Sequence, residues 1–83
     1  MYYTYILISE STGKLYIGQT NNIQTRLHRH NSNKNFSTQN RGPWKVIFSR
    51  EFETRSEAMK HEKYLKSLKN KQYILNKIQK NEL

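Results

Sequence analysis

The amino-acid sequence predicts an α+β fold: a three-stranded antiparallel sheet flanked by helices, in the order β-β-α-β-α-α. Three observations lead to this prediction. Segments rich in aromatic and β-branched residues occur three times, at 2–9, 14–19 and 44–52. Turn residues at 10–13 separate the first two segments, so these are expected to form an antiparallel hairpin. Segments with helical spacing and capping residues follow the second and third strands.

The first half of the chain supplies the hairpin and one helix. Candidate N-cap residues at 20–22 begin that helix, which is expected to run to about His30 because Ile23 and Leu27 lie one turn apart. Residues 31–43 are polar and show no periodicity, which is typical of a long functional or mobile loop. The third strand has an apolar run at 46–48, which favours a central or well-covered position in the sheet.

Two helices are expected after the third strand. Thr54 and Glu57 have the spacing of a capping box, which begins a helix over about 56–69. The expected apolar face of this helix includes Ala58, Met59 and Leu65. Asn70 is a residue that can end it, and a last helix over about 71–80 follows.

Composition narrows the possible functions of the single domain that we expect over residues 1–83. The formal net charge of +9 on so short a chain favours a polyanionic partner, with DNA expected and RNA as the alternative. The absence of Cys excludes disulfides and cysteine zinc sites and is consistent with the cytoplasm. Neither a signal peptide nor a membrane-spanning apolar segment is evident. A protein partner is not identified by the sequence.

The six acidic residues are all Glu, and one of them has an unusual position. Glu62 follows Ala58 by four residues and precedes Leu65 by three, so it falls within the expected apolar face of its helix. A carboxylate there must be paired or must bind a cation, because burying an isolated charge is unfavourable. A structural ion pair with Lys or Arg and a metal site are therefore both open.

Other candidate catalytic or binding residues lie on the first predicted helix and the hairpin. Arg26 and His30 share a face that adjoins Ile23 and Leu27. Arg can bind two phosphate oxygens, and His exchanges protons near neutral pH. Tyr5 and Tyr16 lie within the two strands, where aromatic residues commonly serve packing alone. Gly18 allows close approach of a ligand or a helix to the backbone.

Taken together, these residues resemble the GIY-YIG nuclease family over residues 2–69. The YIG motif of the family is intact at residues 16–18, Tyr-Ile-Gly. The GIY motif is degenerate and keeps only its last tyrosine, Tyr5. Arg26 follows Gly18 by eight residues, His30 follows Arg26 by four, and Glu62 matches the metal-binding glutamate of the family. The resemblance is greatest to short stand-alone members, which are themselves similar to the N-terminal nuclease domain of the bacterial excision-repair incision subunit.

The resemblance implies a metal-dependent endonuclease that hydrolyses DNA, with roles in repair or in processing single-stranded or branched DNA. Glu62 would hold one Mg²⁺ or Mn²⁺, and Arg26 would bind the scissile phosphate. Tyr16 is the leading candidate for the general base, His30 is an alternative base or a relay, and Tyr5 would orient the water. The sequence does not decide between Tyr16 and His30.

Further residues are expected to contact the nucleic-acid backbone: Gly18, Gln19, Arg29, Lys34, Arg41 and Lys45. Gln19 is also a departure from the family, because some members have Lys directly after the motif glycine. Asn70 and Asn76 are both candidates for the asparagine that completes the site in many members. The rival interpretations are a nucleic-acid-binding module that has lost catalysis and an assembly factor that contacts RNA through charge alone.

Overall fold

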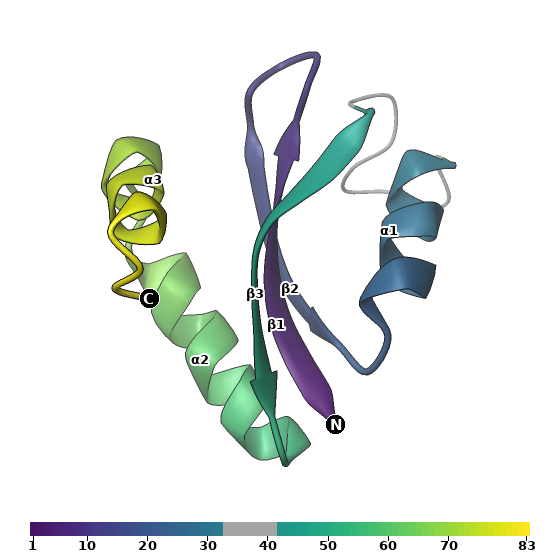
Figure 1. The fold of residues 1–83 in the computed structure, drawn as a ribbon, viewed down its shortest axis with the longest axis vertical. Coiled ribbons are helices and arrows are strands. Elements are labelled where there is room, and N and C mark those ends of the chain that lie inside the picture. Colours follow the sequence, from purple (N-terminus) through teal and green to yellow (C-terminus); the bar gives the residue numbers. More distant parts are fainter. Residues whose placement is uncertain (33–41) are drawn as a thin grey trace.

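The computed structural model describes residues 1–32 and 42–83. Its elements follow the predicted order and form a three-stranded antiparallel sheet with three helices (Figure 1). The elements are β1 (Tyr2–Ser9), β2 (Leu15–Thr20), α1 (Ile23–Asn31), β3 (Trp44–Phe52), α2 (Arg55–Ser67) and α3 (Lys71–Gln79). The strands are arranged β2-β1-β3, and the predicted α+β fold is therefore confirmed.

The sheet is covered on both faces. Figure 1 shows α1 on one side of the sheet and α2 with α3 on the other. Side chains alternate between the faces along β1, so Tyr5 and Leu7 pack with Trp44 beneath α1, while Ile6 packs with Leu65 and Ile74 beneath α2 and α3. A small chain thus buries two separate apolar clusters, and both depend on β1.

The central strand is β1 and not the third strand. The apolar run at 46–48 favoured a central or well-covered position for β3, but β3 pairs only with β1 and forms an edge of the sheet. Its side chains at 46–48 are half-buried because helices cover both faces. Burial under helices and a central place in the sheet give the same apolar pattern, which explains the difference.

A β-bulge in β3 decides which side chains of its first half face α1. Ile6 pairs with Phe48 and Leu7 pairs with Val46, so Ile47 is the extra residue. Because side chains alternate, this insertion moves Trp44 and Val46 into the cluster beneath α1. The same insertion turns Lys45, the partner of Ile8, towards the opposite face.

Capping residues set the helix boundaries. The predicted capping box is present: the Thr54 side chain accepts from the Glu57 backbone N–H, and the Glu57 side chain accepts from the Thr54 backbone N–H. Asn70 was expected to end a helix, but it is the N-cap of α3, and its side chain accepts from Tyr73 N–H. The prediction that Met59 is part of the apolar face is wrong, because its side chain is 49% exposed.

Within the described residues, no helix combines the length and the apolar character needed to cross a membrane.

Gly18 occupies a position where a side chain cannot fit. It pairs directly with Tyr5 across the β1–β2 ladder, and the Tyr5 ring lies over it. A Cβ added at Gly18 would lie 2.6 Å from the Tyr5 hydroxyl oxygen and 2.8 Å from Cζ of the same ring. The glycine of the YIG motif therefore creates the space in which the Tyr5 phenol is buried.

We expect Gly18→Ala to lower the free energy of unfolding by about 1–3 kcal/mol, the usual cost of overpacking a filled core. The buried Tyr5 ring must shift to accommodate the methyl group. Urea denaturation followed by circular dichroism measures the change. Gly42→Ala is the matched control, because there the nearest atom to an added Cβ is 3.4 Å away. Equal stability of the two variants would contradict this explanation of Gly18.

Candidate functional site

A buried hydrogen bond joins the central strand to α1. The Tyr5 hydroxyl lies 3.2 Å from His30 Nε2, and the exposed fractions of the two residues are 2% and 0%. Burial raises the pKa of Tyr5 above its usual range, and the neighbouring Tyr16 raises it further. Burial also lowers the pKa of His30, and Arg26 and Arg29 lower it further. A neutral phenol and a neutral imidazole are therefore favoured at neutral pH.

The Tyr16 ring completes this group from the edge strand. Its centroid lies 4.7 Å from that of His30 and 6.3 Å from that of Tyr5. On another side Tyr16 meets the edge of Trp44, with 6.4 Å between centroids. We call Tyr5, Tyr16 and His30 the tyrosine–histidine cluster; it brings residues from β1, β2 and α1 into mutual contact.

The end of α1 is fixed to the start of β3 by Asn31. Its side-chain amide donates to the Trp44 carbonyl at 3.2 Å, and its side-chain oxygen accepts from the Trp44 backbone N–H. The Asn31 side chain thus makes with the Trp44 backbone the two hydrogen bonds that a neighbouring strand would make. Because His30 directly precedes Asn31, this contact holds the histidine against the sheet. The sequence analysis did not identify Asn31 as a positioning residue.

Two charged residues act on the cluster from opposite layers. The positive charge of Arg26, on α1, opposes the rise in the pKa of Tyr5, whereas the negative charge of Glu62, on α2, adds to it. Both charges are therefore close enough to the Tyr5 hydroxyl to affect its protonation. The structure thus brings Arg26 and Glu62 into electrostatic range of the residues predicted to accompany them.

Glu62 is half-buried and pairs with Lys66. Its side chain is 21% exposed, and Lys66 Nζ lies 2.9 Å from one carboxylate oxygen. The pair spans one turn of α2, and Lys66 is 57% exposed, so the pair is a weak constraint. The expectation that Glu62 faces the sheet side is consistent with its low exposure. The ion pair was one of the two alternatives for this residue.

The donor set at Glu62 suits a cation that keeps most of its water. Among residues 1–32 and 42–83 no group of three or more His, Asp or Glu side chains could enclose a metal ion. Mg²⁺ commonly binds through one or two carboxylates, and water and substrate phosphate fill the remaining positions. A single accessible carboxylate fits that mode, and it does not fit a closed zinc site.

A polar cavity adjoins Arg26. Its volume is about 260 Å³, and Arg26 and Gln19 line it together with Arg55, the first residue of α2. Two guanidinium groups on one small cavity suit phosphate oxygens, because each can donate to two of them. Arg55 was not identified from the sequence, since it resembles any exposed residue in a first helical turn.

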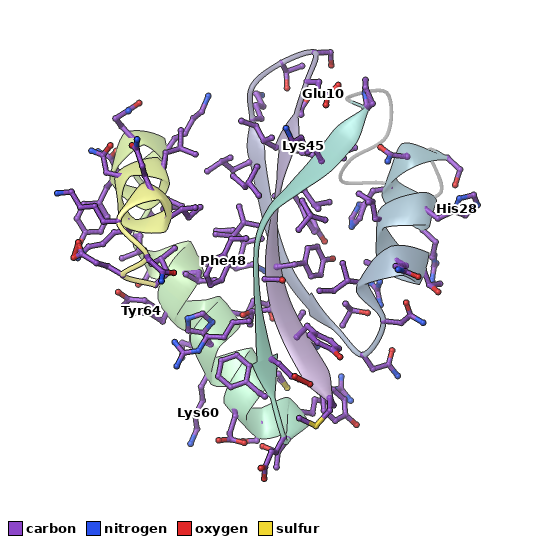
Figure 2. The ribbon with its side chains drawn as sticks, viewed as in Figure 1. Glu10, His28, Lys45, Phe48, Lys60 and Tyr64 are labelled. Carbon is purple, nitrogen blue, oxygen red and sulfur yellow. The ribbon has the colours of Figure 1, made fainter. Side chains whose placement is uncertain are left out.

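The other residues predicted to contact the nucleic-acid backbone lie in different parts of the structure. Gly18 lies beneath Tyr5, and Arg29 is exposed on α1, where it lowers the pKa of His30. Lys45 is exposed at the start of β3 near the β1–β2 turn (Figure 2), on the face opposite the tyrosine–histidine cluster. Lys34 and Arg41 lie outside the described residues.

A second histidine contact lies on the opposite face of β1. Thr4 Oγ1 and His61 Nδ1 are 2.8 Å apart, and the His61 ring contacts Phe48, Phe52 and Tyr64. Burial and Arg50 lower the pKa of His61. This contact fixes α2 to β1 one residue before Glu62. The sequence offered a weak signal for it, since His61 directly precedes the unusual Glu62.

Comparison with known proteins shows the family to which the chain belongs. The family model described as the GIY-YIG catalytic domain matches residues 1–79. A UPF0213 protein of Bacillus licheniformis is 45% identical over 71 residues, which are 84% of this chain and 72% of the relative. A UPF0213 protein of Oceanobacillus iheyensis is 40% identical over 68 residues, covering 81% of this chain and 78% of the relative.

A solved structure has the same fold. The solution NMR structure of the UPF0213 protein from Bacillus halodurans matches with a TM-score of 0.55 and 31% sequence identity. The match covers 90% of this chain and 81% of that chain. Given the family model that spans nearly the whole sequence, the chain belongs to the GIY-YIG catalytic domain family, among relatives named UPF0213 proteins.

Proposed function

We propose that this protein is a divalent-metal-dependent endonuclease that hydrolyses phosphodiester bonds of DNA. The observation that carries the proposal is the buried tyrosine–histidine cluster, to which Arg26 and Glu62 are close enough to act on the pKa of Tyr5. Stability alone does not require a histidine, two phenols, a guanidinium and a carboxylate around one point. Phosphodiester hydrolysis uses each of these groups.

Glu62 is the residue that would hold the metal, one Mg²⁺ or Mn²⁺, in place of its pairing with Lys66. When bound, the ion would neutralise charge that develops on the phosphate and the leaving oxygen. Because Lys66 is largely exposed, its release from Glu62 requires little structural change. The half-buried position of Glu62 keeps the carboxylate oriented towards the sheet.

Arg26 would bind the scissile phosphate, and Arg55 a neighbouring one. Both line the same cavity as Gln19, which can donate a neutral hydrogen bond where some family members have Lys. Arg26 is half-buried, so its interaction with a phosphate is less screened than that of a surface cation. The guanidinium would stabilise the charge of the transition state.

Proton transfer would involve Tyr16 and His30. The raised pKa of Tyr5 keeps its phenol protonated, so Tyr5 is suited to orient the attacking water and poorly suited to act as the base. The lowered pKa of His30 keeps its imidazole neutral and able to accept a proton at neutral pH. The contact between the His30 and Tyr16 rings supports a relay between them.

The substrate selectivity is expected to be structural and not sequence-specific. The net charge of +9 supports binding to phosphates, which carries little sequence information. We therefore propose single-stranded or branched DNA as the substrate class, a role in DNA repair or processing, and the cytoplasm as its location.

The second candidate function is a nucleic-acid-binding module without catalysis. Two observations favour it: Lys66 already pairs with the Glu62 carboxylate, and Gln19 replaces the lysine that some family members have. The basic surface would suffice for binding. Metal-dependent cleavage separates the two functions.

We expect wild-type protein to cut labelled single-stranded or flapped DNA in the presence of Mn²⁺ or Mg²⁺ but not in EDTA. Glu62→Gln and Arg26→Ala should each lower kcat by about 100-fold to 1,000-fold, as losses of transition-state electrostatics do. Glu53→Gln and Arg50→Ala remove equal charges from exposed positions and serve as controls. Binding without cleavage in any metal would favour the non-catalytic module.

Separate substitutions at Tyr16 and His30 should identify the base. Tyr16→Phe removes only the hydroxyl, and we expect a loss of at least about 100-fold in kcat if that oxygen transfers the proton. His30→Gln should cause a smaller loss if His30 is a relay and an equal loss if it is the base. Single-turnover cleavage measures both. Full activity in both variants would mean that the site is assigned wrongly.

The pH profile should reflect the lowered pKa of His30. Neutral imidazole persists below the ordinary pKa of about 6.5, so we expect cleavage to fall only at lower pH, as His30 becomes protonated. In His30→Gln this acidic limb should disappear. Stability also declines as pH falls below about 6.5, because protonation of a buried histidine favours the unfolded state. Circular dichroism at each pH separates the two effects, and an unchanged limb would contradict the role of His30.

A further inference from the structure

A second cavity lies on the other side of β2 from α1, between the edge strand and the junction of α2 and α3. Its volume is about 490 Å³, within the range of ligand-binding clefts. Four exposed lysines from three parts of the chain line it: Lys14, Lys66, Lys69 and Lys71. We propose that this lysine cleft binds an unpaired segment of nucleic acid that flanks the nuclease site. This inference rests on the proposed function.

The charge of the cleft indicates a polyanion. Lys14 follows the hairpin turn, Lys66 lies in the last turn of α2, Lys69 lies between α2 and α3, and Lys71 begins α3. Of these four, Lys66 pairs with a described acidic side chain, Glu62. No acidic residue lines the cleft within the described part of the chain. Lysines act as point charges and bind phosphates without a fixed geometry, which suits a mobile single strand.

The floor of the cleft is apolar. Leu15 and Ile17 of β2 meet Leu65 of α2 and Ile74 of α3 there. Leu65 and Ile74 are buried, so a base of an unpaired nucleotide would pack on the half-buried Leu15 and Ile17 by apolar contact, while its phosphates meet the lysines at the rim. A duplex buries its base faces in the stack and cannot do this. The combination therefore favours a single strand over a duplex.

The backbone supports the shape of the cleft. Gly13 has φ of +75°, and an added Cβ there would lie 3.1 Å from Lys71 Nζ, so Lys71 reaches the hairpin turn from α3. Lys69 has φ of 52°, a left-handed conformation that is unusual for lysine. This residue reverses the chain between α2 and α3. The turn and the helix junction thus bring Lys69 and Lys71 to the same rim.

Two residues connect the lysine cleft with the proposed nuclease site. Tyr16 lines the cleft from β2, while its ring contacts His30 on the opposite face of the sheet. Lys66 lines the cleft as well and pairs with Glu62. A strand whose scissile phosphate lies near Glu62 can therefore continue past the edge of β2 into the cleft.

The test compares two variants with the same loss of charge. The cleft variant is Lys14→Gln/Lys69→Gln/Lys71→Gln, and the control variant is Lys60→Gln/Lys63→Gln/Lys80→Gln. All six lysines are exposed, and Figure 2 shows Lys60 directed away from the sheet. Anisotropy of a labelled oligothymidylate is measured in EDTA from 50 to 300 mM salt, beside a duplex of equal length. Circular dichroism confirms that both variants are folded.

We expect the cleft variant to bind the oligothymidylate roughly tenfold to hundredfold more weakly than wild type, with a log–log salt slope smaller by about 2, since each lost phosphate contact on a single strand contributes about 0.7. The control variant should lose much less, and duplex binding should respond equally to both variants. Equal losses in the two variants, or an unchanged slope, would overturn the inference. Displacement of the oligonucleotide by poly-glutamate at equal charge concentration would also overturn the inference, because the cleft would then suit an acidic protein.

The outcome is independent of cleavage because EDTA removes the metal. Selective binding in the lysine cleft by a protein that never cuts DNA would uphold the cleft and overturn the nuclease proposal. If the wild-type protein cuts DNA but the cleft variant binds the oligothymidylate as tightly as wild type, the nuclease proposal stands and the lysine cleft is overturned.

Discussion

The buried hydrogen bond between Tyr5 and His30 is the constraint on which the site depends. A phenol in the central strand of a covered sheet needs a partner, because an unpaired buried hydroxyl costs about 1–3 kcal/mol. His30 supplies it, so α1 must dock with this histidine towards the sheet. Gly18 supplies the space for the ring, and Asn31 fixes the end of the helix to β3. The residues that stabilise this layer are thus largely those that would perform chemistry.

The edge strand β2 explains how two layers can serve one site. Arg26 approaches Tyr5 from the α1 layer, and Glu62 approaches it from the α2 layer. The Tyr5 ring extends from the central strand over Gly18 of the edge strand β2, and the charges of both residues reach its hydroxyl there. The lysine cleft uses the same edge, since Leu15 and Ile17 form part of its floor. In a chain with a net charge of +9, Glu62 pairs with the exposed Lys66, and a metal ion could take the place of that lysine with little structural change.

Local sequence signals predicted most of the fold, and long-range effects account for the rest. The capping box of Thr54 and Glu57 and the turn chemistry near Gly13 act within a few residues, so they could be read directly. The resemblance to the family predicted the residues of the cluster. The place of β3 at an edge depends on pairing that its own residues do not encode. The bulge at Ile47 turned Lys45 away from the cluster, and no local pattern indicates such an insertion. Arg55 and Asn31 were missed because their roles arise only from contacts distant in sequence.

The central claim is that a metal ion held by Glu62 lies beside the tyrosine–histidine cluster. Paramagnetic broadening by Mn²⁺ measures this proximity directly in the NMR spectrum of the folded protein. The account predicts that substoichiometric Mn²⁺ broadens the ring resonances of Tyr5, Tyr16 and His30 in wild type and leaves them sharp in Glu62→Gln. Broadening centred on other acidic residues, or equal broadening in the variant, would contradict it.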